Sequence, residues 1–255
     1  MAFDLLDSPG VSRPPVVVRR SRRERARRAV RRVLVALLAL VAVTLGVGWV
    51  ATPSVDDAAE RVTAFLMEHE APALTVDPAP ELVQALVAVE DSSYWSNPGI
   101  SPSGVVRSFR GLVTGTDEGG STLPQQLAKN LYLDGENGPV QKAEAVVLAL
   151  KLDGAYSKTE LLAMYLDDGY YGHGFYGLTA ATQGYFGVAP DELTWAQSSL
   201  LAGLFQAPTA YDPLQYPDLA RERQLHVLDR LVDVGDLTQR QADDIADDDW
   251  ALVAG

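Results

Sequence analysis

Apolar residues recur at helical spacing along most of the chain after residue 80. Within residues 82–90, Leu82, Leu86 and Val89 fall on one face of a helix, and Pro80 stands where prolines favour the first helical turn. The same reasoning predicts eight further helices downstream. The predicted helices span residues 80–92, 101–115, 121–133, 139–155, 157–168, 176–186, 194–205, 217–234 and 238–246. The chain is therefore expected to be mainly α-helical.

Polar residues at several predicted helix starts support these boundaries. Ser121, Ser157, Thr194 and Thr238 carry hydroxyl groups that can accept a hydrogen bond from the free N–H groups of a first turn. Strand-like alternation is limited to a short stretch at residues 170–171. We therefore expect helices joined by turns, with little or no sheet.

An apolar run near the N-terminus predicts a single transmembrane helix over residues 33–52. At about 1.5 Å of rise per residue, the run approaches the roughly 30 Å hydrocarbon core of a bilayer. The arginines before it favour a cytoplasmic N-terminus and an extracytoplasmic domain. A cleavable signal peptide is the competing interpretation. The long basic region and the lack of a clear small-x-small cleavage site favour an anchor retained in the cytoplasmic membrane.

The rest of the chain divides at changes in composition. Residues 1–32 are rich in arginine and proline without an apolar period, which predicts a disordered tail. Residues 53–79 contain one weakly helical segment followed by prolines, and we interpret them as a juxtamembrane connector. Residues 80–250 then form the predicted globular domain.

Composition narrows the classes of function. With 255 residues and 47% hydrophobic content, the chain can bury one sizeable core. The absence of cysteine excludes disulfides and thiol nucleophiles, and the three histidines lack metal-ligand spacing. Ten of the 21 Lys and Arg residues lie in residues 1–32, whereas 31 of the 34 acids follow them. An acidic body of this kind argues against nucleic acid as a partner.

The first candidate for chemistry is the acid pair that ends the predicted helix over residues 80–92. Glu90 follows an apolar wall, and burial of a carboxylate disfavours its charged form, which suits a general acid or base. A solvated helix end remains the plainer alternative for Glu90. Asp91 is better suited to hydrogen bonds with the local backbone.

The second candidate is the helix predicted at residues 121–133. Its start follows two glycines and offers free N–H groups to an anion, and its polar side chains gather on one side at i, i+3 and i+4 spacing. An N-capped surface helix is an equally open interpretation. The polar side chains concerned are Thr122, Gln125, Gln126, Lys129 and Asn130.

The stretch at residues 101–115 mixes Val105 and Val106 with Arg107 and Arg110. A basic amphipathic segment in an anchored protein can lie on the bilayer surface. An ordinary helix facing the core is the alternative, and the membrane interpretation is only slightly favoured.

These pieces together resemble the peptidoglycan glycosyltransferases of glycosyltransferase family 51. The family's first motif, E-D-x-x-F-Y-x-H-x-G, corresponds to residues Glu90 to Gly99. The second motif, G-x-S-T-x-T-Q-Q-x-x-K-N, corresponds to Gly119 to Asn130. Later segments keep the family's order and spacing, so the resemblance covers roughly residues 75–245.

The resemblance implies a mainly helical, lysozyme-like domain that polymerises lipid II outside the cytoplasmic membrane. It implies Glu90 as the catalytic base. Its implied partners are the undecaprenyl-pyrophosphate-linked glycan, the membrane and other proteins of cell-wall synthesis. No resident cofactor or metal site is expected, although a divalent cation could serve as counter-ion for the pyrophosphate. The substrate-binding residues expected with Glu90 are Asp91, Ser121, Thr122, Gln125, Gln126, Lys129, Asn130, Lys142 and Glu144.

The third family motif, R-K-x-x-E, is incomplete in this chain. It corresponds to Gln141-Lys142-Ala143-Glu144-Ala145, so the lysine is kept while the arginine and the second glutamate are not. Glu144 stands one residue early, a rotation of about 100° on a helix. Two other positions depart from the motifs: Asn97 replaces the histidine and Pro124 replaces a threonine.

Two hypotheses about function follow from this pattern. The first is an active but divergent transglycosylase, in which Glu90 and the Lys129 helix still serve the reaction. The second is a catalytically impaired protein that binds lipid II or acts as a scaffold in cell-wall synthesis. A lysozyme-type hydrolase shares the implied fold but is disfavoured, because hydrolysis does not need a cation for a lipid pyrophosphate.

Overall fold

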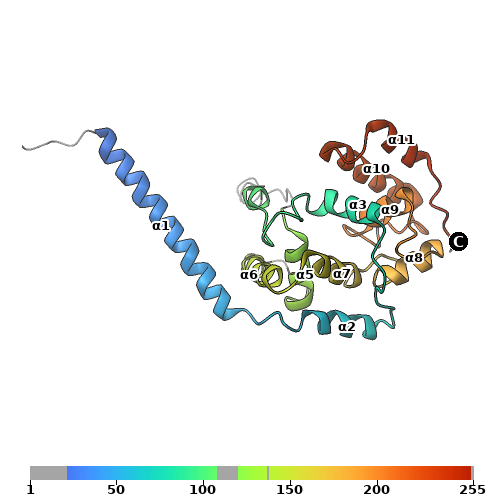
Figure 1. The fold of residues 1–255 in the computed structure, drawn as a ribbon, viewed down its shortest axis with the longest axis horizontal. Helices are drawn as coiled ribbons and strands as arrows, with labels where there is room; N and C mark the ends of the chain where they lie inside the picture. Colours follow the sequence, from blue (N-terminus) through green and yellow to red (C-terminus); the bar gives the residue numbers. More distant parts are fainter. Residues whose placement is uncertain (1–21, 108–119, 137, 254–255) are drawn as a thin grey trace, which may run out of the picture. The chain divides into compact units, whose positions relative to one another are not determined.

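The computed structural model describes residues 22–107, 120–136 and 138–253, and these form helices joined by turns and loops. No β-strand occurs within these residues, and Tyr170 and Tyr176 form an isolated antiparallel bridge where a short strand was predicted. The prediction of a mainly α-helical chain is confirmed (Figure 1). Of the helix predicted at 101–115, residues 102–107 are helical, and residues 108–115 lie outside the described part.

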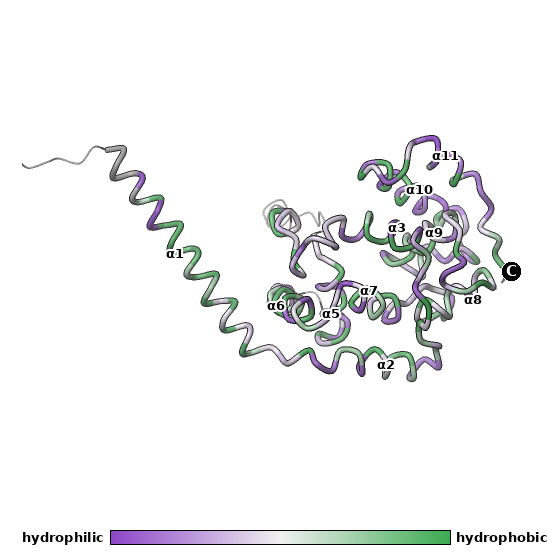
Figure 2. The backbone as a smooth tube through the Cα atoms, in the orientation of Figure 1, coloured by the Kyte–Doolittle hydropathy of each residue, from purple (hydrophilic) through white to green (hydrophobic). Residues whose placement is uncertain are grey.

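Helix α1 (Arg22–Ala51) contains the apolar run, and most of it has hydrophobic colouring in Figure 2. Its segment Ala29–Ala51 contains an 18-residue stretch with a mean hydropathy of 2.6, none of it buried, so the segment is long and apolar enough to cross a membrane. The helix begins inside the stretch predicted to be a disordered tail. Residues 22–32 are helical because arginine is a good helix former and an existing helix extends cheaply.

Helix α2 (Ala58–Glu68) lies in the segment predicted to be a connector, yet it is part of the core. Its residues Ala58, Val62 and Leu66 are buried at helical spacing. The chain divides into two compact units, Met1–Val47 and Gly48–Gly255. The domain therefore begins well before residue 80, because the apolar face of α2 is buried within it.

The helices of the second unit form two groups. Helix α3 (Pro80–Glu90) packs against α9 (Trp195–Leu204) and α10 (Pro217–Val234), and α10 also contacts α11 (Gln239–Asp247). Helix α5 (Leu123–Tyr132) packs against α6 (Pro139–Ala155) and α7 (Lys158–Asp167), while α8 (Leu178–Phe186) contacts α7. Figure 1 shows these groups beside one another, with α3 and α5 at their boundary.

Helix α9 lies at the centre of the first group. All its residues from Ala196 to Leu204 are buried, which is typical of a helix enclosed by protein on every side. On α3, Leu82, Ala85 and Leu86 are fully buried. This packing holds the C-terminal end of α3, where Glu90 lies, at a fixed place beside α5.

The predicted helix caps are mostly confirmed. Ser157, Thr194 and Thr238 are N-caps, and each forms a reciprocal capping box with the residue three positions later. The prediction of Ser121 as a cap is wrong by one residue. Thr122 is the N-cap of α5, because Pro124 fits the second position of that helix and Gln125 completes the capping box.

Candidate functional site

Glu90 is the last residue of α3, and its side chain is partly buried. Its carboxylate Oε2 accepts a hydrogen bond from the Nε2 of Gln126 at 2.8 Å. The two residues are 36 positions apart in the chain and come from different helix groups. The acid that ends α3 and the polar helix α5, predicted as separate candidates, therefore meet in one place.

Tyr165 of α7 fixes the orientation of the Gln126 amide. The Tyr165 hydroxyl donates to the Oε1 of Gln126 at 3.0 Å, which leaves the amide N–H groups to face Glu90. Burial, and then the nearby charge of Glu90, raise the pKa of Tyr165 well above its usual value. The hydroxyl therefore remains protonated and acts as a donor. The Tyr165 ring stacks on Phe205 with ring centroids 5.0 Å apart.

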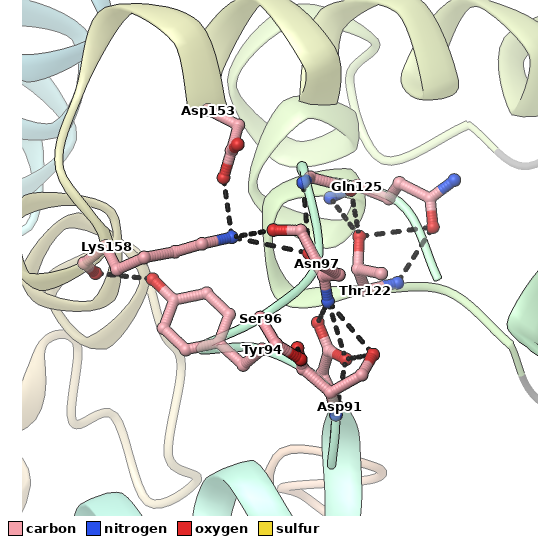
Figure 3. Close-up of polar contacts among 10 residues, drawn as sticks. Asp91, Tyr94, Ser96, Asn97, Thr122, Gln125, Asp153 and Lys158 are labelled. Atoms are coloured by element: carbon pink, nitrogen blue, oxygen red, sulfur yellow. Dashed lines mark hydrogen bonds and ion pairs between the residues drawn. The ribbon is translucent and has the colours of Figure 1, made fainter. Parts of the chain in front are cut away.

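Asp91 is buried and bound by its own loop. Its carboxylate accepts from the Asn97 Nδ2 at 3.1 and 2.9 Å, and from the Ser93 hydroxyl at 2.9 Å. Figure 3 shows Asn97 between Asp91 on one side and Lys158 on the other. Asp91 thus shapes the loop that follows Glu90 mainly through side-chain donors, and the expected bond to the local backbone comes from the Ser93 N–H at 3.3 Å.

Asn97 links this loop to α6 and α7. Its backbone oxygen accepts from the Nζ of Lys158 at 2.7 Å, and the same ammonium forms an ion pair with Asp153. At Gly99, φ is +82° and a Cβ atom would lie 2.5 Å from the Ala149 carbonyl oxygen, so the turn has no room for a side chain. Asn97 stands where the first family motif has a histidine, and at this position its side chain forms a complete set of hydrogen bonds.

The start of α5 is built by Thr122 and Gln125. The Thr122 hydroxyl donates to the Gly99 carbonyl oxygen at 2.6 Å and accepts from the Gln125 N–H, while the Gln125 side chain accepts from the Thr122 N–H at 2.8 Å. Thr122 is fully buried, whereas Ser121 is exposed. These two side chains hold the helix start in place, and their expected contacts with substrate stay a prediction.

Lys129 and Asn130 lie one turn further along α5. Within the described ranges, no carboxylate lies within ion-pair distance of the Lys129 ammonium, so its charge is available to an anion. Asn130 donates to the Oδ2 of Asp168 at 2.8 Å. Burial raises the pKa of Asp168 to about 6, and the hydrogen bond from Asn130 opposes that rise.

A pocket of about 70 Å³ opens beside Glu90. Its polar lining includes serine hydroxyls from the loops on either side, among them Ser92 and Ser121, and two arginines, Arg107 and Arg230. Ser121 and Glu90 therefore line the same pocket, and the expected contact of Ser121 with substrate stays a prediction. A small site with hydroxyl and guanidinium groups suits an anionic or hydroxyl-rich ligand.

The residues of the third motif lie on α6. Lys142 is exposed and Glu144 is partly exposed, while Ala145 is buried on the face that also buries Leu148. Gln141, at the arginine position, donates to the Glu136 carboxylate at 2.7 Å. No hydrogen bond or ion pair joins Lys142 or Glu144 side chains to another residue of the described part, so their expected roles stay predictions.

Within the described ranges, no group of three or more His, Asp or Glu side chains is placed to hold a metal ion. The arrangement offers a carboxylate held by an amide, an ammonium on the same helix as that amide, and a polar pocket. Such a set can take a proton from a hydroxyl group and stabilise negative charge on a leaving group.

Comparison with known proteins agrees with this geometry. A sequence profile described as "Transglycosylase" matches residues 60–232, which begin in α2 and end in α10. The match covers well over half of the chain and includes Glu90, Gln126 and Tyr165. The chain belongs to the transglycosylase family.

Individual relatives support this membership. The transglycosylase is 36% identical over 195 residues to a Cupriavidus necator protein named as a candidate transglycosylase, covering 75% of this chain and 81% of that protein. It is 36% identical over 191 residues to penicillin-binding protein 1F of Bacillus subtilis, covering 74% of this chain and 27% of the relative. For penicillin-binding protein 1A of Escherichia coli, the identity is 39% over 166 residues, covering 64% and 20% respectively. The chain thus spans about a quarter of the length of the penicillin-binding proteins it matches.

Two residues of the transglycosylase site had no predicted role. Tyr165 lies in the helix predicted over residues 157–168, for which the sequence indicated no contact with the site. Arg230, on α10, donates to the Ala88 carbonyl oxygen 142 positions earlier. Neither contact has a signal in the local sequence, because each partner comes from a distant helix.

Proposed function

We propose that this transglycosylase polymerises lipid II into glycan strands at the outer face of the cytoplasmic membrane. The observation that carries the proposal is the hydrogen bond from Gln126 to Glu90, which joins the candidate base to the helix that bears Lys129. A peptidoglycan glycosyltransferase needs these two parts side by side, since a proton is removed and a pyrophosphate leaves in the same reaction.

In the proposed reaction, Glu90 is the catalytic base. The 4-hydroxyl of one lipid-linked sugar loses its proton to the Glu90 carboxylate as its oxygen attacks the anomeric carbon of the growing chain. A new C–O bond forms, and the bond from the anomeric carbon to the pyrophosphate oxygen breaks with inversion. The Gln126 amide occupies one carboxylate oxygen, so the other oxygen is the one available to the hydroxyl.

We assign the stabilisation of negative charge on the leaving pyrophosphate to α5 and to the pocket beside Glu90. Lys129 and Asn130 are the proposed pyrophosphate ligands on α5, and Ser121 lines the pocket beside Glu90. Positive groups fixed before the reaction stabilise developing charge at little cost in reorganisation. Lys142 and Glu144 are proposed as further donor-side ligands in place of the incomplete third motif.

The apolar features of the protein are consistent with a substrate that carries a lipid chain. Helix α1 supplies a segment long and apolar enough to anchor the chain, and Trp95, Val105 and Val106 are exposed large hydrophobic residues close in sequence to the site. Exposed apolar side chains of this kind suit contact with a bilayer. We propose that they rest at the membrane surface, with other cell-wall synthesis proteins as partners.

Incubation of the purified full-length chain with fluorescent lipid II in detergent tests the proposal. The expected product is a ladder of glycan strands on a denaturing gel, degraded by a muramidase. Saturable binding of lipid II without any polymer, across a titration of magnesium and manganese, would contradict it and favour a binding or scaffold role.

A further inference from the structure

The C-terminal end of α3 is held by an arginine from a distant helix. Arg230 of α10 donates from Nε to the Ala88 carbonyl oxygen at 3.1 Å and from Nη2 to the Ser92 hydroxyl at 3.4 Å. Ala88 lies two residues before Glu90 and Ser92 lies two residues after it. One guanidinium group therefore contacts the backbone and the loop on both sides of Glu90.

This contact lies at the C-terminal end of α3. The last carbonyl oxygens of a helix have no partner within the helix and carry its negative end. A guanidinium group satisfies such a carbonyl and its charge stabilises the helix end. The planar fork of arginine can meet two acceptors at once, which a lysine ammonium on a flexible stem does less well. Arg230 thus restrains the turn in which Glu90 lies.

The remaining contact of the guanidinium group is also to the protein. Its Nη1 is 3.9 Å from the Asp233 carboxylate, one turn further along α10. The side chain is 42% exposed and lines the same pocket as Glu90. Its Nε and Nη2 both donate to protein acceptors beside Glu90, which indicates a role in holding the site.

We infer that Arg230 is a positioning residue, which fixes the Glu90 carboxylate for catalysis by tying Ala88 and Ser92 to α10. The inference rests on the proposed function, since it assumes that Glu90 is the base. A displacement of about 1 Å in a catalytic group can reduce turnover by roughly a hundredfold. Loss of Arg230 therefore lowers kcat, and it leaves the KM for substrate almost unchanged.

The test compares Arg230→Ala with Arg221→Ala in the full-length chain. Arg221 is a matched control on α10, because its guanidinium donates to the Ala246 carbonyl oxygen near the end of α11, away from Glu90. With fluorescent lipid II, Arg230→Ala is expected to lower kcat at least about tenfold with KM within about twofold, whereas Arg221→Ala keeps both. Arg230→Lys is expected to fall between wild type and Arg230→Ala, and added ethylguanidinium to restore part of the Arg230→Ala rate.

Hydrogen exchange measured by mass spectrometry gives a second readout that does not depend on activity. Faster exchange in residues 87–94 of Arg230→Ala, and not of Arg221→Ala, is expected, and Ser92→Ala should show a smaller increase. A higher KM with unchanged kcat would identify a substrate ligand instead and overturn the inference, as would wild-type kinetics. If the wild-type chain makes no polymer, the proposed function fails, and unchanged exchange in residues 87–94 would then overturn the positioning role separately.

Discussion

At the scale of single residues, the site depends on buried polar groups that satisfy one another. Asn97 binds the Asp91 carboxylate through its amide N–H groups and accepts from Lys158 through its oxygens. Both Asp91 and Asn97 are almost fully buried. A buried carboxylate without partners is costly, so the loop after Glu90 keeps its shape only while Asn97 is present.

Asn97→Ala is therefore expected to lower the free energy of unfolding by about 2–3 kcal/mol, because it leaves the buried Asp91 carboxylate short of donors. Chemical denaturation of the full-length protein in detergent measures this change. Ser96→Ala, in the same loop but exposed, is the control and should have little effect. Equal stabilities for the two variants would show that the network in Figure 3 contributes little.

The buried carboxyl group of Asp168 leads to a prediction about how the free energy of unfolding depends on pH. Its pKa is raised from 3.8 to about 6 by burial, so between these values the native protein holds a proton that the unfolded chain has released. The free energy of unfolding contributed by Asp168 therefore falls as pH rises through this window, by on the order of 3 kcal/mol in total. The carboxylate costs stability above pH 6, and this cost is absent below about pH 4.

Asp168→Asn removes the titration and keeps an oxygen that can accept from Asn130. Relative to wild type, this variant should gain stability as the pH is raised from 4 to 7.5. Urea unfolding at both pH values measures the difference between the two proteins. A difference that is the same at both pH values would contradict the raised pKa.

At the scale of elements, α5 carries the polar side chains and its start determines where they point. Thr122 joins that start to the loop after Glu90 through the Gly99 carbonyl oxygen. The helix and the loop are thereby fixed together. The cap has a direct consequence for the site, because Gln126 lies in the first turn and a half of the helix.

Thr122→Ala is expected to destabilise the protein by about 1–2 kcal/mol through loss of the cap, and to reduce turnover because Gln126 loses its fixed position. Thr238→Ala, which removes the equivalent capping box of α11, should lower the melting temperature but preserve the rate below it. Melting curves and initial rates on lipid II measure both effects. If the two variants slow the reaction equally, α5 has no special link to the site.

Local patterns predicted the helices well because capping and apolar periodicity act within a few residues. The starts at Ser157, Thr194 and Thr238 follow from such short-range signals. The meeting of Glu90 with Gln126 was only implied by the family motifs. The contacts of Tyr165 and Arg230 join residues 39 and 142 positions from their partners, and such pairings depend on how helices pack rather than on their own sequence.

At the scale of the whole molecule, the apolar segment Ala29–Ala51 is expected to anchor the chain in the membrane, with the domain and its site outside the cytoplasm. The basic residues before this segment favour a cytoplasmic location for the N-terminus. The chain has no cysteine, so single introduced cysteines report their location without background.

Labelling of intact cells with a membrane-impermeant maleimide tests this topology. Asp236→Cys, at an exposed position after α10, should be labelled from outside, whereas Ser8→Cys should be labelled only after the membrane is opened. Cleavage as a signal peptide would separate Ser8→Cys from the domain on a gel. Labelling of Ser8→Cys in intact cells would reverse the predicted orientation.

The central claim is that the carboxylate of Glu90 drives polymerisation of lipid II, and one comparison tests it most directly. Wild type and Glu90→Gln are purified as full-length chains, matched for melting temperature and for binding of fluorescent lipid II, and assayed for glycan strands in parallel. The account predicts strands from wild type and a rate at least about a hundredfold lower from Glu90→Gln, since a general base contributes on that scale. Equal polymerisation by the two proteins would contradict it.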